Sequence, residues 1–385
     1  MIFLTELLQL YHKYGIKLVK GFMQYVWDDK GVKYLDLHAG YGTAFLGHSN
    51  PKIVDKIYEQ MRKLMVASYS FDVDIRDECI KALSKILPKE LEYVFFQNSG
   101  TEAVEAALKF SRKYTGRKTF VSFTKAFHGR TMGALSLTWN PKYRKPFEPL
   151  LKNVVFAEFN NVEDVDRVIT DDVAAVVVEV IQGEGGLERA THDFLHAIRS
   201  RCDEVGCVVV FDEVQSGFGR TGKIWAHQHY NTKPDIITAG KAIGGGYPVS
   251  LVAIRREIGD SLEIGEHGTT YGGNPVACAA VLASINVLLE ENVPKKAAKI
   301  GEYFAKRLKE LISNREELKV KGLGLMLGLD VSEDPKPLIE KLLRENIITL
   351  KAGESVLRFL PPYMITREDV DRVIEALEKV LVSFK

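Results

Sequence analysis

Short, unbroken apolar runs alternate with amphipathic segments through the middle of the chain, and this pattern constrains the fold most strongly. The runs at residues 174–180 and 208–211 are rich in β-branched side chains and show little polar alternation. Such runs are typical of strands buried on both faces, as in parallel sheets whose crossover helices cover both sides. Further strands are expected at residues 93–96, 119–123, 235–239 and 249–254, with a helix at residues 102–114. The pattern predicts an α/β fold with a mostly parallel sheet and helices on both faces.

The C-terminal part of the chain has a different character. Helical patterns at residues 294–312 and 366–381 flank short strands near residues 320–329 and 347–350. This mixture is typical of a small α+β domain.

The chain has 385 residues, enough for two packed units, since domains usually hold about 100–200 residues. We expect a large domain at residues 46–285 and a small C-terminal domain at residues 286–385. The N-terminal segment 1–45, with short strands at residues 25–27 and 34–36, is expected to pack on the small domain.

Composition excludes several classes of protein. The formal net charge is +1, which argues against a general binder of nucleic acids or membranes. No apolar run approaches the roughly 20 residues that span a bilayer. The first 15 residues lack the basic start of a secretory signal and fit a short amphipathic helix better. We therefore expect a cytoplasmic protein.

The metal-binding residue types are scattered. Four cysteines occur, at Cys79, Cys202, Cys207 and Cys278. Because no CxxC pair is present, buried free thiols are expected rather than a zinc site or a redox motif. His192 and His196 have helical spacing but lack the surrounding HExxH pattern. The sequence predicts no metal site.

A first candidate for ligand binding is the segment Asn98-Ser99-Gly100-Thr101-Glu102, which follows a predicted strand and opens a predicted helix. Ser99 or Thr101 can cap that helix, and Gly100 lets a ligand approach the backbone. Free N–H groups and the helix dipole make such a start suited to phosphate. An ordinary capped helix start explains the same residues, so the segment alone decides nothing.

Asp212 and Lys241 each stand at the end of a predicted strand, where open α/β sheets place their ligands. They are 241 − 212 = 29 residues apart, about one crossover unit, so both can face one site. Lysine in a dry cleft loses its proton more readily and becomes a nucleophile. A carboxylate at a strand end could instead cap a helix or hold a metal, and a lysine beside glycines could be a surface residue.

Two loops supply further candidates. Phe127 could stack on a flat ring, and Arg130 could bind a carboxylate with its planar fork. The hydroxyls of Thr269 and Thr270, in a glycine-rich loop, can donate to phosphate. A core phenylalanine, a surface arginine and a plain turn explain these residues equally well when each is taken alone.

Taken together, the chain resembles the class III aminotransferases. The resemblance rests on seven blocks in order, NSGTEA, FHGRT, QGEGG, DEVQSGFGRTGK, AGKAIGGG, HGTTYGGNP and RFLPP. It extends from about residue 25 to the C-terminus. It implies the fold-type I architecture and pyridoxal 5′-phosphate as cofactor.

The resemblance also implies residue roles. Lys241 matches the lysine that holds the cofactor covalently, and Asp212 the partner of its pyridine nitrogen. The other cofactor contacts implied are Ser99, Gly100 and Thr101 at the phosphate, Phe127 and Val214 on the ring faces, and Gln215 at the 3′ oxygen. Thr270 matches the residue that reaches the phosphate in the neighbouring subunit, which implies a homodimer.

The implied chemistry is ping-pong transfer of an amine, with Lys241 moving a proton as general base and then as general acid. 2-Oxoglutarate is the implied acceptor and leaves as glutamate. Arg130 and Arg358 match positions that bind its carboxylates, and Thr269 lies beside the substrate. Glu184 matches a gate residue that masks Arg358 when a terminal (ω) amine enters.

Within the family, FHGRT with Arg130 favours the acetylornithine branch. Residues 46–48 and 351–354 and the RFLPP ending look like the enzymes of carrier-linked lysine and arginine biosynthesis. Their donor is lysine or ornithine attached to the C-terminal glutamate of a small acidic carrier protein. The alternatives that remain are acetylornithine aminotransferase, another ω-aminotransferase, and a mutase, racemase or decarboxylase that uses pyridoxal 5′-phosphate. A non-catalytic regulator that binds this cofactor is a further alternative. A basic rim at the pocket mouth, with Lys351 as one candidate, would favour the carrier protein.

Overall fold

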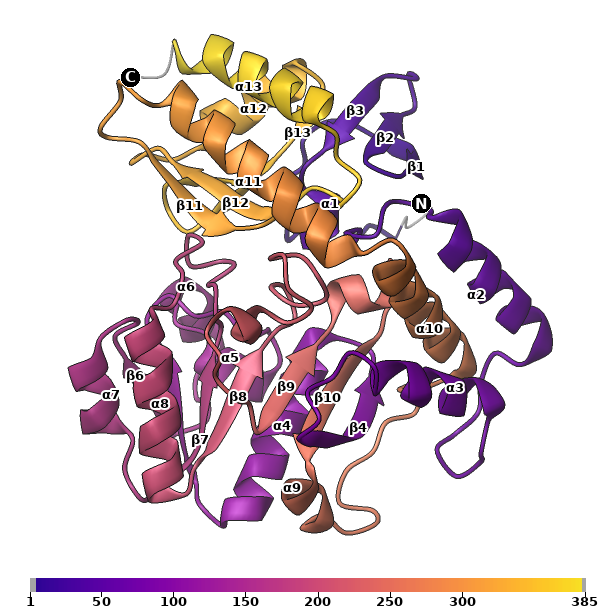
Figure 1. Ribbon diagram of the computed structural model, residues 1–385, viewed down its shortest axis with the longest axis vertical. Coiled ribbons are helices and arrows are strands. Elements are labelled where there is room, and N and C mark those ends of the chain that lie inside the picture. Colours follow the sequence, from indigo (N-terminus) through magenta and orange to yellow (C-terminus); the bar gives the residue numbers. More distant parts are fainter. Residues whose placement is uncertain (1–4, 383–385) are drawn as a thin grey trace.

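The computed structural model describes residues 5–382, and its central feature is a seven-stranded sheet in the order β4-β10-β9-β8-β7-β5-β6 (Figure 1). Its strands are β4 (Leu91–Gln97), β5 (Thr119–Phe123), β6 (Val154–Ala157), β7 (Val173–Val178), β8 (Val208–Asp212), β9 (Ile236–Ala239) and β10 (Ser250–Arg255). The pairs from β6 through β9 are parallel, and β10 is antiparallel to both of its neighbours. The predicted mostly parallel sheet is confirmed.

Strand β7 shows why these sequences form a sheet covered on both sides. Val176 and Val178 pack in a core cluster with α8 (His192–Val205). Ala175 and Val177 point the other way and pack in a cluster with α4 (Gly100–Thr115). Since both faces are buried, β7 needs apolar side chains at every position, and its six residues are all buried.

Further helices complete the large lower body seen in Figure 1. They are α2 (Pro51–Lys63), α3 (Asp74–Leu83), α5 (Met132–Leu137), α6 (Pro141–Arg144), η1 (Lys145–Phe147), α7 (Val162–Val168), η2 (Ala226–His229), η3 (Lys241–Gly244), α9 (Arg256–Asp260) and α10 (Pro275–Glu290). The short helix α1 (Ala39–Gly42) belongs to the N-terminal segment and lies beside the smaller lobe in Figure 1. No single helix within residues 5–382 is both long and apolar enough to cross a membrane; α10 and α11 (Val293–Leu311) reach that mark only as a pair bent by 63°.

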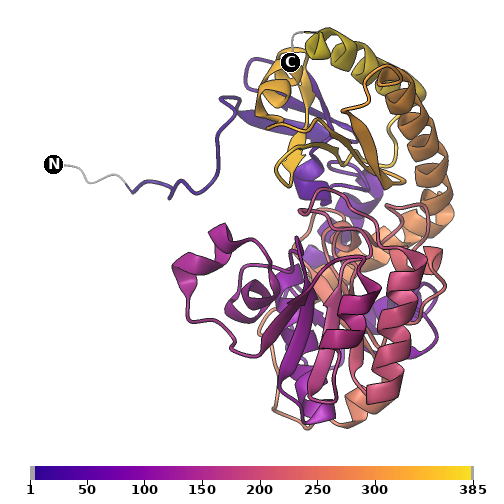
Figure 2. The ribbon, with the colours of Figure 1, turned by 90° about the vertical axis from the view of Figure 1, so that its left-hand side faces the viewer.

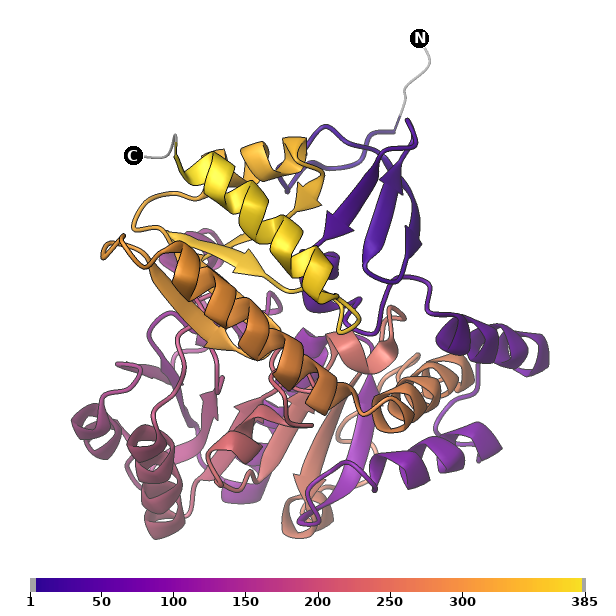
Figure 3. The ribbon, with the colours of Figure 1, turned by 45° about the horizontal axis from the view of Figure 1, so that its top comes forward.

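A smaller lobe holds two four-stranded sheets (Figure 3). One has the order β11-β12-β15-β14, from β11 (Lys319–Leu323), β12 (Met326–Asp330), β15 (Val356–Phe359) and β14 (Leu350–Ala352). The other has the order β1-β2-β3-β13, from β1 (Leu18–Phe22), β2 (Tyr25–Asp28), β3 (Lys33–Asp36) and β13 (Ile347–Ile348). Because Leu35 pairs with Ile347, N-terminal strands and a C-terminal strand share one sheet. Helices α11, α12 (Lys336–Arg344) and α13 (Arg367–Leu381) pack beside them.

Arg220 fastens the two lobes together. Its buried guanidinium donates to the carbonyl oxygens of Leu325 (2.9 Å), Pro361 (3.2 Å) and Gly42 (2.9 Å). The same group lies over the Phe45 ring, 4.3 Å from its centroid. Burial, together with the charge of Arg358, lowers the pKa of Arg220 to about 9. One side chain from the large body thus reaches backbone of the N-terminal segment and of the C-terminal lobe.

The predicted N-terminal helix is wrong for the residues that the structure describes. Residues 5–15 form no helix, and the rest of the predicted segment, residues 1–4, lies outside the described part of the chain. Leu7, Leu8 and Leu10 are all strongly exposed. An isolated helix this short is marginal in water, and with no surface to pack its apolar stripe against, the segment stays extended.

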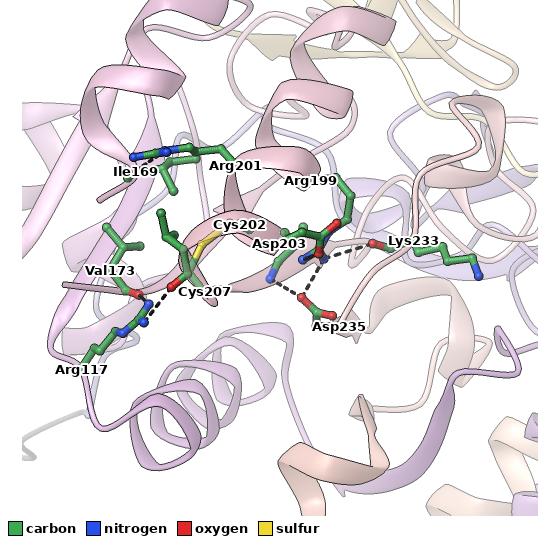
Figure 4. Close-up of a disulfide and its surroundings, with 12 residues drawn as sticks. Arg117, Ile169, Val173, Arg199, Arg201, Cys202, Asp203, Cys207, Lys233 and Asp235 are labelled. Atoms are coloured by element: carbon green, nitrogen blue, oxygen red, sulfur yellow. Dashed lines mark hydrogen bonds and ion pairs between the residues drawn. A yellow bond between two sulfur atoms is a disulfide. The ribbon is translucent and has the colours of Figure 1, made fainter. Parts of the chain in front are cut away.

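The expectation of four free thiols is also wrong. Cys202, near the end of α8, forms a disulfide with Cys207, just before β8 (Figure 4). Gly206 between them has φ +73°, a left-handed turn that reverses the chain and brings the two Cα atoms within 4.7 Å. Cys79 and Cys278 are free and buried, as expected.

Candidate active site

Lys241 and Asp212 come together at the carboxyl edge of neighbouring strands. Asp212 ends β8, and Lys241 follows β9 after one glycine. Asp212 pairs with Thr238 in the β8–β9 ladder, which fixes the two strand ends side by side. The Lys241 backbone has φ +46°, a left-handed conformation that a side-chain-bearing residue keeps only where its surroundings hold it.

The Lys241 side chain is half-buried, and this position sets its chemistry. Burial lowers its pKa from the ordinary value, while the carboxylates of Glu184 and Asp212 act in the opposite direction. No protein group within residues 5–382 forms a hydrogen bond or ion pair with this amine. A lysine whose burial lowers its pKa is a better nucleophile and a better general base than an exposed one.

Asp212 is held by three donors. Its Oδ2 lies 2.8 Å from Nδ1 of His128, its Oδ1 accepts from the Thr238 hydroxyl at 3.2 Å, and the Val214 N–H donates to Oδ1 at 3.1 Å. Burial opposes protonation of His128, but the hydrogen bond and charge of Asp212 outweigh it and raise the histidine pKa. These three hydrogen bonds fix the Asp212 carboxylate at the end of the sheet.

The start of α4 forms a narrow cradle. The Glu102 carboxylate accepts from the N–H groups of Asn98 and Ser99, both at 2.8 Å, and so orders the turn that precedes the helix. A Cβ on Gly100 would lie 2.7 Å from a methyl of Val214, so only glycine fits there. The N–H groups of the first turn, at Gly100 and Thr101, have no intrahelical acceptor and point out of the helix. The Thr101 hydroxyl is partly occupied, because it bonds the Thr131 hydroxyl at 2.7 Å.

Glu184 and Arg358 form the ion pair that the sequence predicts. Their side chains are 2.7 Å apart, and Arg358 is fully buried on β15. The Arg358 guanidinium also donates to the Gly183 carbonyl at 2.7 Å and to Oε1 of Gln215 at 3.2 Å. Its Nε has no partner in the described chain. A carboxylate that displaced Glu184 would therefore find an arginine already aimed and desolvated.

Arg130 lies on the other side of the site and is exposed. Its guanidinium stacks on the Tyr143 ring at 3.6 Å and lies 5.5 Å from the Phe127 ring centroid. It forms no ion pair with any carboxylate within residues 5–382. Stacking orients the planar fork while leaving its N–H groups available to an incoming carboxylate.

Glu179 is a site residue that the sequence analysis missed. Its carboxylate accepts from the Phe127 N–H and from the Gly183 N–H, both at 2.9 Å, and so joins the aromatic loop to the loop of Glu184. Burial raises its pKa to about 7, against the opposing charge of His128. A signal was present, because Glu179 is the carboxylate inside the apolar run at residues 174–180.

Thr269 and Thr270 do not join this group within one chain. They line a separate hollow of about 380 Å³ beside Gln97, Asn98 and Glu102. The Thr269 hydroxyl accepts from the Gly272 N–H at 3.1 Å, and Thr270 is exposed. Their predicted roles at a shared, two-subunit site stay predictions.

Comparison with known proteins agrees with this geometry. A profile of the family Aminotransferase class-III matches residues 10–381. The chain belongs to the class III aminotransferases. It is 48% identical to the [LysW]-aminoadipate semialdehyde/glutamate semialdehyde transaminase of Sulfurisphaera tokodaii, over 98% of each chain. It is 44% identical to the acetylornithine aminotransferase of Archaeoglobus fulgidus, over 97% of each chain. The fold matches the ornithine aminotransferase of Toxoplasma gondii with a TM-score of 0.92 at 28% identity, covering 98% of this chain and 92% of that one.

Class III aminotransferases depend on pyridoxal phosphate, and the residues of this aminotransferase fit that cofactor. A lysine amine without a partner, a strand-end carboxylate fixed by a histidine, and an open helix start lie around one space. Gly100 and Gly240 both lie against the Val214 side chain, and a larger residue at either position would come too close to it. When bound, the cofactor withdraws electrons from the carbon that bears the substrate amine.

Proposed function

We propose that this aminotransferase moves the terminal amine of lysine or ornithine, attached to a carrier protein, onto 2-oxoglutarate. The ion pair between Glu184 and Arg358 carries the proposal, because it lets one pocket serve both an uncharged ω-amine arm and a dicarboxylate. The S. tokodaii relative, whose name includes the carrier LysW and two semialdehydes, supports the choice of donor. The reaction belongs to lysine or arginine biosynthesis.

We propose the following division of roles. Lys241 holds the cofactor and, once released by substrate, accepts the proton from the substrate carbon and returns it. Asp212, fixed by His128, pairs with the pyridine nitrogen. The remaining contacts proposed are Ser99, Gly100 and Thr101 at the phosphate, Phe127 and Val214 on the two ring faces, and Gln215 at the 3′ oxygen.

The gate would work through charge. With Glu184 on Arg358, the inner pocket presents no free positive charge, so the amine arm enters without a repelling neighbour. When Glu184 swings away, Arg358 binds the α-carboxylate of glutamate or 2-oxoglutarate, and Arg130 binds the distal carboxylate. A desolvated arginine–carboxylate pair is worth more than an exposed one, which makes Arg358 the stronger grip.

We further propose a homodimer in the cytoplasm. A second copy would cover large exposed apolar side chains of the N-terminal half and the loop before α10, namely Tyr41, Val54, Tyr58, Met61, Met65, Val66, Phe71 and Tyr271. It would also bring Thr270 to its partner's cofactor phosphate. The division into residues 1–45, 46–285 and 286–385 is likewise kept as a proposal, because all strands of the central sheet lie between Leu91 and Arg255.

Acetylornithine aminotransferase is the second candidate. The A. fulgidus relative of that name is 44% identical, and the two readings share Arg130, Glu184 and Arg358. The inner pocket does not separate them, since the ω-amine arm is similar in both donors. The difference must lie outside it, where the α-amine carries either an acetyl group or a protein.

A single-turnover absorbance experiment tests the proposal. The cofactor-loaded enzyme is mixed with N-acetylornithine in one series and with lysine-bearing LysW in another, and the loss of cofactor absorbance is followed. We expect conversion at far lower concentrations of the carrier-linked lysine. Preference for N-acetylornithine would establish the second candidate, and no response to either would overturn both.

A further inference from the structure

An excess of unpaired positive charge lies beside the site. Between Lys125 and Lys152 the sequence holds six cations, Lys125, Arg130, Lys142, Arg144, Lys145 and Lys152, against one carboxylate, Glu148. The whole chain has a net charge of only +1, so this stretch departs sharply from the average. None of the six cations forms an ion pair with any group of residues 5–382.

Two cations that face the pocket region are neutralised. Lys351, the predicted rim residue, lies 2.8 Å from the Asp334 carboxylate and is not a free cation. The Glu184–Arg358 pair does the same inside the pocket. The stretch from Lys125 to Lys152 is distinguished by its local excess of six cations over one carboxylate, which gives this surface a net positive charge.

The middle of this stretch also exposes aromatic surface. Phe147, the last residue of η1, is 56% exposed, and Trp139, two residues before α6, is 37% exposed. Lys142 and Lys145 are exposed on the same two helical turns. We call these four residues the α6 patch. Aromatic side chains ringed by basic ones are typical of a surface that binds an acidic protein.

The α6 patch is continuous with the candidate active site. Tyr143 of α6 lies beneath the Arg130 guanidinium at 3.6 Å, and its ring meets the edge of Phe127 with centroids 6.2 Å apart. Arg144 anchors the other side of the helix by stacking over Phe156 at 4.7 Å. In Figure 2 the segment stands out from the large body on the side away from α11. A protein bound at the α6 patch would therefore lie at the entrance of the pocket and leave the pocket itself open to the substrate.

We propose that the α6 patch is the docking surface for the acidic protein that carries the substrate amine, a proposal that rests on the function proposed above. A free amino or oxo acid held by Arg130 and Arg358 has no charge left for Lys142 and Lys145. A protein attached to the substrate does, and its negative charge would be steered to the mouth. A second copy of this chain is a poorer occupant, because a two-fold contact through the patch would bring like charges together.

The test uses the cofactor-loaded, full-length enzyme and the variant Lys142→Glu/Lys145→Glu. Two substrates are compared, lysine-bearing LysW of S. tokodaii and N-acetylornithine, which has no protein attached. We expect kcat/KM for the carrier-linked substrate to fall by at least about tenfold, with weaker salt dependence, since charge complementarity governs encounter. For N-acetylornithine we expect a change within about twofold, because binding of a small substrate needs no steering by this patch.

A matched control reverses two other exposed lysines. Lys295 and Lys299 are exposed on α11 and form no ion pair within the described residues, and α11 runs along the opposite side of the molecule in Figure 2. The variant Lys295→Glu/Lys299→Glu makes the same change in net charge and should leave both substrates unaffected. Isothermal titration of LysW into each enzyme gives a second readout, with weaker binding expected only for the α6 variant.

The outcomes separate the two proposals. If the wild-type enzyme fails to prefer carrier-linked lysine, the proposed function falls and the docking surface falls with it. If the preference holds but the α6 variant matches the wild type, only the docking surface is overturned. An equal fall in kcat/KM for both substrates would mean that the patch acts in the active site itself. Loss of the dimer on sedimentation would make it a contact between copies, and either result overturns the proposal.

Discussion

The carboxylates around Lys241 are held in unequal ways. Asp212 has His128 as an ionic partner, and Glu184 has Arg358. Glu179 has only two backbone N–H groups as hydrogen-bond partners, and burial raises its pKa to about 7, an effect that the charge of His128 offsets only in part. Because Glu179 is buried with hydrogen bonds but without an ion pair, its ionisation is unfavourable in the folded chain, and the stability of the fold therefore depends on pH.

Glu179→Gln should change how stability depends on pH. The folded pKa of about 7 lies above the ordinary 4.5, so between these values the folded chain keeps a proton that the unfolded chain has lost. Stability of the wild type therefore falls as pH rises from 4.5 to about 7 and then levels off. Glutamine does not titrate, so relative to the wild type the variant should gain about 3 kcal/mol across this window. Thermal unfolding of the cofactor-free proteins at several pH values measures the difference, and a constant difference would contradict the assignment.

Arg358→Ala should separate the two half-reactions. The variant loses the desolvated grip on the α-carboxylate, so the rate with glutamate should fall by about 100-fold or more. The rate with an ω-amine donor should fall much less, because that donor meets Arg358 only in its masked form. Stopped-flow absorbance of each half-reaction measures both, and an equal fall would refute the gate.

Glu184→Gln provides the opposite control. It leaves Arg358 intact but unmasked, so the ω-amine half-reaction should be the one that suffers. Selective loss with glutamate in this variant would mean that Glu184 acts on the acceptor instead.

At the level of helices and strands, the apolar runs predicted the central sheet well. Residues 119–123 form β5 without any shift, and residues 208–211 lie inside β8. These strands are buried on both faces, so local composition alone records their environment. The N-terminal segment failed because amphipathic periodicity says nothing about whether a partner surface exists. Glu179 was missed because its role depends on two loops that meet only in the folded chain.

The Cys202–Cys207 bridge was invisible for a related reason. Spacing by five residues fits no common motif, and the turn at Gly206 alone makes the bond possible. Figure 4 shows Arg117 beside the bridge, and its guanidinium donates to the carbonyl oxygens of Val173 and Val205. The disulfide fixes the end of α8 against the start of β8, the strand that ends in Asp212, and Arg117 ties the same helix end to the start of β7.

Cys202→Ala/Cys207→Ala should lower stability modestly. Closing so short a loop restricts the unfolded chain by about 2 kcal/mol. For a chain of this size that corresponds to a fall in Tm of roughly 2–3 °C. Scanning calorimetry checks this, and the same variant with and without reductant should show one Tm, whereas the wild type should show two. A wild-type Tm that ignores reductant would mean that the bridge does not form in solution.

At the scale of the whole molecule, the site depends on how two lobes meet. Lys241 and Asp212 belong to the seven-stranded sheet, while Arg358 belongs to β15 of the smaller lobe. Arg220 is the buried group that ties these parts to each other and to the N-terminal segment. The sequence blocks pointed to Lys241, Asp212 and Arg358 as site residues. They did not predict the role of Arg220, because contacts between two lobes produce no pattern in the local sequence.

Arg220→Met should destabilise the enzyme strongly. The change leaves the buried carbonyl oxygens of Gly42, Leu325 and Pro361 without their donor, which should cost about 3–5 kcal/mol. We expect Tm to fall by roughly 5 °C, and KM for 2-oxoglutarate to rise because Arg358 loses its fixed position. Arg189→Met, at an exposed arginine without an ion pair, is the matched control and should change little. Similar Tm values for the two variants would rule out Arg220 as the tie between lobes.

The placement of Arg358 on a different sheet from Lys241 has an evolutionary consequence. If the proposed roles hold, mutations around α6 can change the approach of the amine donor without disturbing β15, the strand that carries Arg358. Ancestors of such an enzyme could exchange one donor for another while the supply of nitrogen from glutamate went on uninterrupted. That separation accounts for how one scaffold came to be shared by relatives named for acetylornithine, for ornithine and for carrier-linked semialdehydes.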